Sequence, residues 1–249
     1  MRTAPHEKRG DDPAGAPGPT QAPAGRRAGR ERPAAVDTKG IILDVAIRHF
    51  AAFGYEGAHV RKMLGEAGLN LALAHYHYGS KAALYEAAVR RYLMEVLDWR
   101  RAGLAAWRRT DGPREARLIG LFESYVEPHM RIAMGPGGAD YARLMQRALG
   151  QLSAHSRTFQ QEVLEVRRAF TAELAQFLPD ADPVHLERGM DALVSVMLSE
   201  SIRRAAPRRR SAENARVEAA RAAAAFVARL IAGGLPAAAH PAKDTEASP

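Results

Sequence analysis

Apolar side chains recur at intervals of three and four residues along most of the chain, which predicts an all-helical protein. The first such pattern predicts a helix over about residues 38–53 that ends at Gly54, because glycine readily takes the left-handed conformation that closes a helix. Its apolar side carries Ile42, Ala46, His49, Phe50 and Phe53. We expect His49 to be a hydrogen-bonded core histidine rather than a ligand.

Two short helical patterns joined by a tight turn follow between His59 and Lys81. The apolar stripe of the first pattern consists of Val60, Met63, Leu64 and Ala67. Gly68 is placed to stop that helix, and Asn70 is a preferred N-cap residue for a second helix that begins at Leu71. The pattern therefore predicts a helix-turn-helix motif over residues 59–78.

The second helix of this motif should have one buried and one exposed side. At about 3.6 residues per turn, the inward arc consists of Leu71, Ala74 and Tyr78. The opposite side carries Ala72, Leu73 and Tyr76, with His75 and His77 at its edges. It contains no acidic residue, so a phosphate backbone could approach it.

A third helix is predicted to begin directly after the motif. Gly79 ends the second motif helix, and Ser80 is placed to cap the next one. Lys81, its first residue, adds a cation beside amide groups that already favour an anion. The segment therefore presents several donors to phosphate.

About six helices are predicted from Ser80 onward, because the helical period continues and no alternating strand pattern appears. The first runs to about Arg109, and the second begins at Arg114 and contains Pro128, which should kink or split it. The others cover about residues 139–149, a segment capped by Ser156 that ends before Pro179, a segment from Asp182 and Pro183 to near Pro207, and about residues 212–232.

The two ends of the chain differ in composition from the helical part. Residues 1–36 are rich in Pro, Gly, Ala and Arg and should form a disordered basic arm, and residues 234–249 a disordered tail. Four arginines close to the first helix could reach a DNA minor groove or remain solvated; they are Arg26, Arg27, Arg30 and Arg32.

The formal net charge of +8 favours a polyanionic partner such as nucleic acid. The excess lies outside the motif, because residues 37–84 hold five Lys or Arg against four acids. The chain contains no cysteine, which excludes disulfides and thiolate metal sites. No apolar run approaches the roughly 18 residues of a membrane span, and no secretory leader pattern is present, so we expect a cytoplasmic protein without membrane contact.

The sequence contains few residue patterns typical of enzyme active sites or metal sites. His75 and His77 diverge by about 200° on a helix and cannot chelate one ion. Motifs typical of hydrolases, zinc sites and nucleotide binding are absent, and Glu162 and Glu165 fit a solvated helical face. We therefore expect no catalytic residue, no metal and no cofactor.

The order of a first helix, FGYEGAHVRKMLGEAGLN and YHYGSKAALYEAAVRR resembles the DNA-binding domain of TetR-type transcriptional regulators over about residues 38–92. Ala58 and His59 stand where that family usually has a capping Thr or Ser. The resemblance implies that the second motif helix enters the major groove and that Tyr76, His77 and Lys81 hold phosphates. The expected DNA-binding residues are His59, Arg61, Asn70, Leu71, Ala72, Leu73, His75, Tyr76, His77 and Lys81.

The resemblance extends more weakly to the C-terminal region, where such regulators pair their last two long helices into a homodimer. It implies a helix-turn-helix domain over residues 37–83 and a helical effector-binding and dimerisation domain over residues 84–233. Aromatic and Met side chains concentrate in the second region; the expected effector-pocket residues are Trp99, Phe122, Tyr125, His129, Met145 and Phe170. Core packing is the alternative explanation for each of them.

The function implied is that of a sequence-specific DNA-binding regulator, a dimeric repressor released from a palindromic operator by a small apolar or aromatic effector. The alternative is a helical DNA-binding or interaction protein without a ligand response. The few cations in the motif favour the first function, because nonspecific binders depend on many contacts from Lys and Arg to phosphate.

Overall fold

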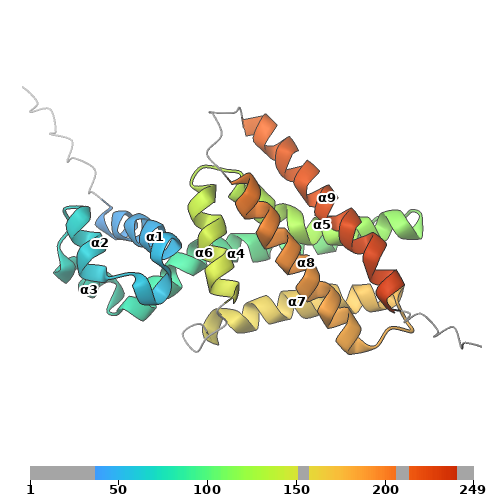
Figure 1. The fold of residues 1–249 in the computed structure, drawn as a ribbon. Helices are drawn as coiled ribbons and strands as arrows, with labels where there is room; N and C mark the ends of the chain where they lie inside the picture. Colours follow the sequence, from blue (N-terminus) through green and yellow to red (C-terminus); the bar gives the residue numbers. More distant parts are fainter. Residues whose placement is uncertain (1–36, 151–156, 206–212, 240–249) are drawn as a thin grey trace, which may run out of the picture. The chain divides into compact units, whose positions relative to one another are not determined.

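A computed structural model describes residues 37–150, 157–205 and 213–239 (Figure 1). These ranges contain nine α-helices and no strand, which confirms the all-helical prediction. The helices are α1 (Thr38–Gly57), α2 (Val60–Glu66), α3 (Leu71–Tyr78), α4 (Lys81–Trp107), α5 (Arg114–Ala133), α6 (Gly138–Gly150), α7 (Arg157–Phe177), α8 (Pro183–Arg204) and α9 (Glu213–Ala239). The basic arm, the cap at Ser156, Pro207 and residues 240–249 lie outside the described residues.

Helix α1 begins at an Asp37 cap, whose side chain accepts a hydrogen bond from the Gly40 amide at 2.9 Å. Gly54 interrupts it with a φ of 71° and a ψ of −178°, and one further turn continues to Gly57. The prediction that Phe53 lies on the buried side is wrong, because its side chain is 53% exposed. The buried stripe passes through Ile42, Ala46, Phe50 and Gly54 at intervals of four, which turns Phe53 outward.

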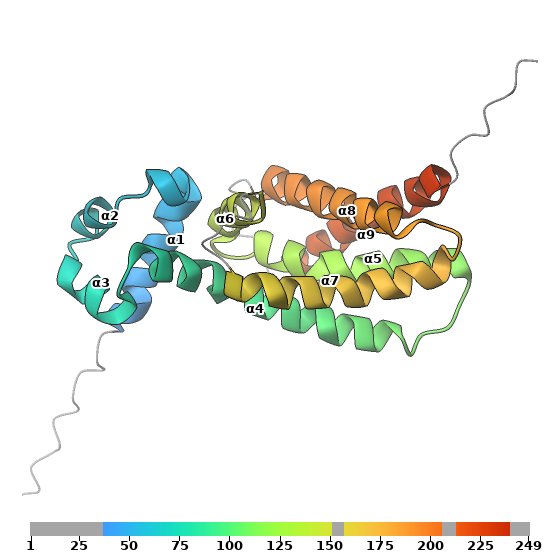
Figure 2. The same cartoon turned by 90° about the horizontal axis from the view of Figure 1, so that it is seen from below.

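Helix α4 connects the helix-turn-helix motif with the C-terminal bundle. Its first half packs against α1 and α3, and the helix also packs against α5, α6 and α7 (Figure 2). The side chains of Leu84, Tyr85 and Ala88 belong to the same buried cluster as those of α1 and α2. One helix therefore contributes to the packing of both regions.

Helix α5 runs without a break from Arg114 to Ala133, although Pro128 lies inside it. Of the two outcomes predicted for Pro128, a kink or a split, the split is therefore wrong. Proline removes one hydrogen bond from a helix, and α5 is held by extensive packing against α9 on one side and α4 on another. Pro128 itself is buried in this packing.

Helix α9 extends further than its sequence pattern predicted. It continues past Gly233 and Gly234 to Ala239, so the prediction of a loose tail is wrong for residues 234–239. Leu235 explains the extension, because its side chain is 7% exposed and packs on α8 at Gly189. A Cβ atom at Gly189 would lie 2.5 Å from Leu235 Cδ1, so the glycine permits this close approach.

Candidate nucleic-acid interface and ligand cavity

The turn between α2 and α3 is closed by local hydrogen bonds. Gly68 has a φ of 67°, which a glycine adopts without strain, and the Leu69 amide donates to the Leu64 carbonyl at 2.8 Å. The Asn70 side chain then accepts from the Ala72 amide at 2.8 Å and starts α3. His59 occupies the cap position of α2 without a side-chain cap bond. The turn therefore has the short, rigid form of a helix-turn-helix motif.

The inward side of α3 is anchored on the core of α1, α2 and α4. Ala74 is buried, and Leu71 and Tyr78 are half-buried, as the sequence pattern predicted. The Tyr78 hydroxyl donates to the Lys39 carbonyl at 2.8 Å, and burial raises the pKa of this phenol. These contacts fix the rotation of α3 about its own axis.

The outward side of α3 is open to solvent. Tyr76 is 83% exposed and Leu73 is 39% exposed. Ala72 and His75 are also exposed on α3, and Asn70, His59 and Arg61 are exposed on the segments before it. The rotation of α3 therefore presents most of the expected DNA-binding side chains together.

Three of the expected DNA contacts are restrained by neighbouring groups. The His75 Nδ1–H donates to the Gly79 carbonyl at 3.0 Å, which restrains the exposed imidazole ring. Half-buried His77 packs edge-on against Tyr76, with ring centroids 5.1 Å apart. Lys81 places its Nζ 4.7 Å from the Tyr55 ring centroid and 3.4 Å from the Glu56 carbonyl oxygen. Lys81 thus lies against the end of α1.

A cavity of about 430 Å³ lies among the helices of the C-terminal region. Its walls come from α4, α5, α6, α7 and α8 and are mostly apolar; they include Leu93, Phe159, Val163, Met197 and Leu198. Tyr125, an expected pocket residue, lines this cavity, and its ring packs edge-on against Phe170 at 5.0 Å. The volume lies within the range of small-molecule sites.

The other expected pocket residues occupy different environments. Phe122, Met145 and Phe170 are each 1% exposed and belong to the main hydrophobic cluster. Trp99 is half-buried, lies 4.7 Å from the Arg131 guanidinium and lines a separate groove of about 300 Å³. The structure therefore does not bring the six residues into one site, because most of them fill the core.

His129 is buried beside a second helix rather than facing the cavity. Its Nδ1 lies 2.6 Å from the Tyr141 hydroxyl, and its Nε2 has no hydrogen-bond partner among the described residues. Burial, assisted by the positive charge of Arg100, lowers the pKa of His129 to about 3, and burial raises the pKa of Tyr141. The pair is therefore neutral and links α5 to α6.

Arg100 is a cavity residue that the sequence analysis did not identify. It is 5% exposed, lines the 430 Å³ cavity and stacks on Tyr125. An arginine in a long amphipathic helix usually indicates a solvated face, which explains the omission. The available signal was its position, because Arg100 continues the apolar stripe formed by Leu93, Leu97 and Leu104.

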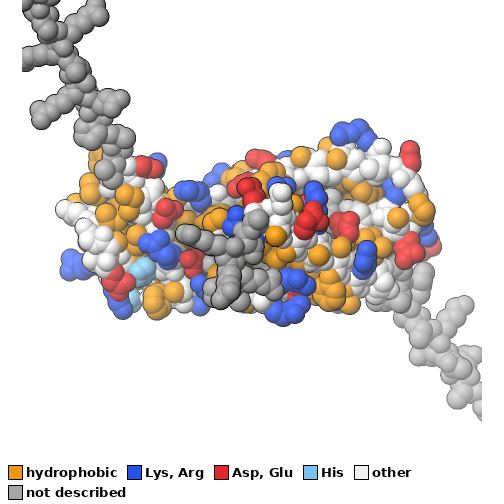
Figure 3. Space-filling model, turned by 90° about the horizontal axis from the view of Figure 1, so that it is seen from above, with side chains coloured by type: hydrophobic (Ala, Val, Ile, Leu, Met, Phe, Trp, Pro, Cys, Tyr) orange, Lys and Arg blue, Asp and Glu red, His pale blue; other side chains and the backbone are white. Residues whose placement is uncertain are grey.

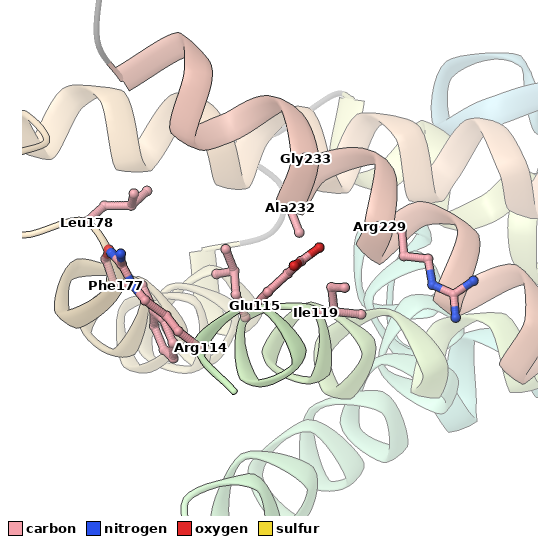
Figure 4. Close-up of a pocket in the computed structure, with 9 residues that line it drawn as sticks. Arg114, Glu115, Ile119, Phe177, Leu178, Arg229, Ala232 and Gly233 are labelled. Atoms are coloured by element: carbon pink, nitrogen blue, oxygen red, sulfur yellow. The ribbon is translucent and has the colours of Figure 1, made fainter. Parts of the chain in front are cut away.

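A larger groove of about 630 Å³ lies between α5, the end of α7 and α9. Figure 4 shows Glu115 and Ile119 on α5 facing α9, with Arg229 along the same helix pair. Its charged residues Arg114, Glu115 and Arg229 are all exposed. The charged groups of this groove are therefore of both signs and are all in contact with water. None of these three side chains is a buried polar group directed into the groove.

No cluster of three or more metal-ligating side chains occurs in residues 37–150, 157–205 and 213–239. Within the same ranges, none of the helices has the length and hydrophobicity that crossing a bilayer requires.

The family model described as bacterial regulatory proteins, tetR family, matches residues 42–88, and the model for the tetracyclin repressor-like C-terminal domain matches residues 123–234. The chain belongs to the TetR family of transcriptional regulators. Membership of this family of regulators confirms the prediction that the protein is not an enzyme.

Individual proteins are similar to the chain over different lengths. The HTH-type transcriptional regulator BetI of Agrobacterium fabrum strain C58 is 36% identical over 74 residues, which are 30% of this chain and 34% of that protein. The chain thus spans about a third of the length of this curated relative. A crystal structure of a protein assigned as a transcriptional regulator, from Pseudomonas aeruginosa PAO1, is 20% identical and has a TM-score of 0.50, covering 80% of this chain and 92% of that one. This similarity supports the fold.

A second solved structure is the TetR family transcriptional regulator PfmR from Thermus thermophilus. It is 19% identical, has a TM-score of 0.48, and covers 76% of this chain and 97% of that one.

Proposed function

We propose that the protein binds DNA sequence-specifically as a dimeric repressor and is released from a palindromic operator by a small apolar or aromatic effector. The observation that carries the DNA-binding part is the outward side of α3. Its side chains are exposed while the turn and the inward side are fixed by caps and burial. A rigid helix with an exposed face is what insertion into a major groove requires.

The exposed residues divide into two proposed roles. Ala72 and Leu73 lie nearest the bases and can contact thymine methyl groups, whereas Tyr76, His77 and Lys81 position the protein on phosphates. Polar base-reading side chains are few, so DNA shape supplies part of the discrimination. On the face shown in Figure 3, acidic and basic side chains are interspersed over the described helices, which is unlike the single basic patch of a nonspecific binder.

Dimerisation is proposed to use α8 and α9. Three large apolar side chains on these helices remain in contact with water in the single chain: Val184 is 58% exposed, Phe226 is 49% exposed and Leu230 is 53% exposed. A second copy would cover such side chains, and two motifs would then contact two half-sites about 10 base pairs apart or at a multiple of that spacing. A regulator that acts on DNA in this way would work in the cytoplasm, without membrane contact.

The alternative function is that of a helical DNA-binding or interaction protein without a ligand response. That function would not require the cavity. The 430 Å³ space with largely apolar walls favours a protein that binds a small molecule. Occupancy would alter DNA affinity only if the effector prefers one arrangement of the two motifs over another.

The test is binding of the purified protein to DNA upstream of its own coding sequence, measured by gel shift and footprinting with sedimentation. We expect a dimer on a palindromic site, and Tyr76→Ala should weaken binding. Phe53→Ala is the matched control, because Phe53 is an exposed aromatic residue of α1 rather than α3. DNA bound by a monomer, or equal affinity for unrelated sequences, would contradict the proposal.

A further inference from the structure

The cavity wall contains a buried cation without an acidic partner. Arg100 is 5% exposed, and its Nε–H donates to the Tyr125 backbone carbonyl at 2.8 Å. Its Nη2 donates to Met197 Sδ at 3.5 Å, and its guanidinium carbon lies 3.7 Å from the centroid of the Tyr125 ring. Within the described ranges no carboxylate forms an ion pair with it.

This environment compensates the charge of Arg100 only in part. Arginine stays protonated in proteins and offers five N–H donors, whereas the contacts above use two of them, one with a weak sulfur acceptor. Stacking on Tyr125 contributes a cation–π attraction. A buried charge usually requires a counter-charge, because removal from water is costly. An anion in the cavity would supply both the counter-charge and the missing acceptors.

The second arginine of the cavity shows the usual solution to the same problem. Arg167 on α7 forms ion pairs with Glu187 and Asp191 of α8, each at 2.7 Å. Asp191 also lines the cavity and is ion-paired with Arg167, which it shares with Glu187. Gln160 and Ser195 add only neutral polar groups. Among the charged side chains that line the cavity within the described ranges, Arg100 is therefore the one that forms no ion pair, and its charge is positive.

We propose that this cavity binds a small ionised carboxylic acid with an apolar body. The carboxylate accepts hydrogen bonds from the Arg100 guanidinium, whose planar donors match two carboxylate oxygens. The apolar body contacts Leu93, Phe159, Val163 and Leu198. This inference rests on the proposed function, because it specifies the chemical class of the effector of the same protein.

The first experiment is isothermal titration calorimetry of the full chain without DNA, using ligands that share a skeleton and differ in charge. One series is 2-naphthoate, 2-naphthamide and 2-naphthylmethylamine; a second is dodecanoate and 1-dodecanol. In at least one series the acid should bind about tenfold or more tightly than its neutral counterpart, and the amine should bind weakest. Equal affinity of acid and neutral compound in both series, or no binding of either acid, would overturn the inference.

The second experiment uses variants of the arginine. Arg100→Met, which keeps much of the side-chain length but lacks the charge, should remove the preference for the acid and leave the affinity for the neutral compound unchanged. Arg100→Lys keeps the charge without the planar donors and should show an intermediate preference. Arg101→Met is the control, because Arg101 is an exposed neighbour on the same helix that pairs with Asp98 at 2.9 Å.

Thermal unfolding checks that each variant is folded. If Arg100→Met does not fold, the acid preference of Arg100→Lys tests the role of the arginine instead. An undiminished acid preference in a folded Arg100→Met protein, or an equal loss in Arg101→Met, would contradict the assignment. Operator release is measured separately. An acid that binds through Arg100 without releasing DNA would support this inference and contradict the proposed switch. Operator binding without binding of either acid would contradict this inference and leave the proposed DNA-binding function supported.

Discussion

The outward side of α3 and the cavity among α4 to α8 are two proposed binding sites built in opposite ways. On α3, side chains such as Tyr76 are exposed, and the polar groups that end the helix are paired by nearby residues. In the cavity, a charged group is buried and has no charged partner among the described residues. The first site depends on rigidity and exposure, and the second depends on burial. Substitutions should therefore affect stability and binding in different proportions at the two sites.

The largest expected effect is the difference in stability loss between substitution of a buried and of an exposed leucine in the motif. Leu64 is 1% exposed and Leu73 is 39% exposed. Leu64→Ala should lower the free energy of unfolding by about 2–5 kcal/mol and abolish DNA binding, because it leaves a void under α2 and α3. Leu73→Ala should change stability by about 0.5 kcal/mol or less while altering operator preference. Urea unfolding and gel shifts measure both, and similar stability losses would refute the division.

The second prediction tests burial of a neutral histidine in the bundle. The pKa of His129 is about 3 in the folded protein and near 6.5 in the unfolded chain, so the unfolded state binds more protons between these values. Stability contributed by this group is complete above about pH 6.5 and falls by about 1.4 kcal/mol per pH unit as pH decreases toward 3. His129→Gln should remove this part of the slope. Urea midpoints at pH 7 and pH 5 for both proteins provide the measurement, and parallel losses would contradict the prediction.

The third prediction concerns the contact between the two regions. Arg147 of α6 donates through Nε and Nη2 to the Ala51 and Ala52 carbonyls of α1, each at 3.1 Å. Arg147→Met should reduce the coupling between effector and operator by about 1 kcal/mol, roughly fivefold in the affinity ratio, while each affinity alone stays similar. Arg143→Met is the control, since Arg143 is exposed on the same helix. Unchanged coupling would show that these two hydrogen bonds do not carry the connection between the regions.

The smallest expected effect is that of one phosphate contact. Lys81→Ala should weaken specific and nonspecific DNA about equally and reduce the slope of log affinity against log salt by about one. In the free protein the Lys81 Nζ lies against the Tyr55 ring. The loss of this contact therefore offsets part of the free energy that Lys81 gains by binding a phosphate. Titrations at several salt concentrations test this. A change in the preferred operator base with nonspecific affinity intact would show that Lys81 reads bases.

Much of the motif, and some helix starts outside it, could be predicted from the sequence because the interactions that define them are local. Asn70, Ser80 and Asp182 each accept a hydrogen bond from an amide two or three residues ahead, as their positions predicted. Gly68 and Gly79 have the positive φ values expected at helix ends. The exposed and buried sides of α3 follow from the same short-range geometry. The DNA contacts themselves remain predictions.

Features that depend on distant contacts were not predictable in this way. The last turns of α9 are held by Leu235 on Gly189, residues 46 positions apart in the chain. The cavity combines residues from Leu93 to Leu198, and aromatic content alone did not distinguish its wall from the core around Phe122 and Met145. Arg100 shows that a charged residue within an apolar stripe is a more specific signal than a cluster of aromatic residues.

Helix α4, which begins at the Ser80 cap and ends at Trp107, also has a mechanical consequence. Its 27 residues span about 40 Å at about 1.5 Å per residue. A tilt of about 5° around one end would displace the other end by about 3.5 Å, close to the rise of one base-pair step of about 3.4 Å. In a dimer with two such helices, a small change of the α4 angle around a ligand would be enough to move α3 out of register with the major groove of the DNA.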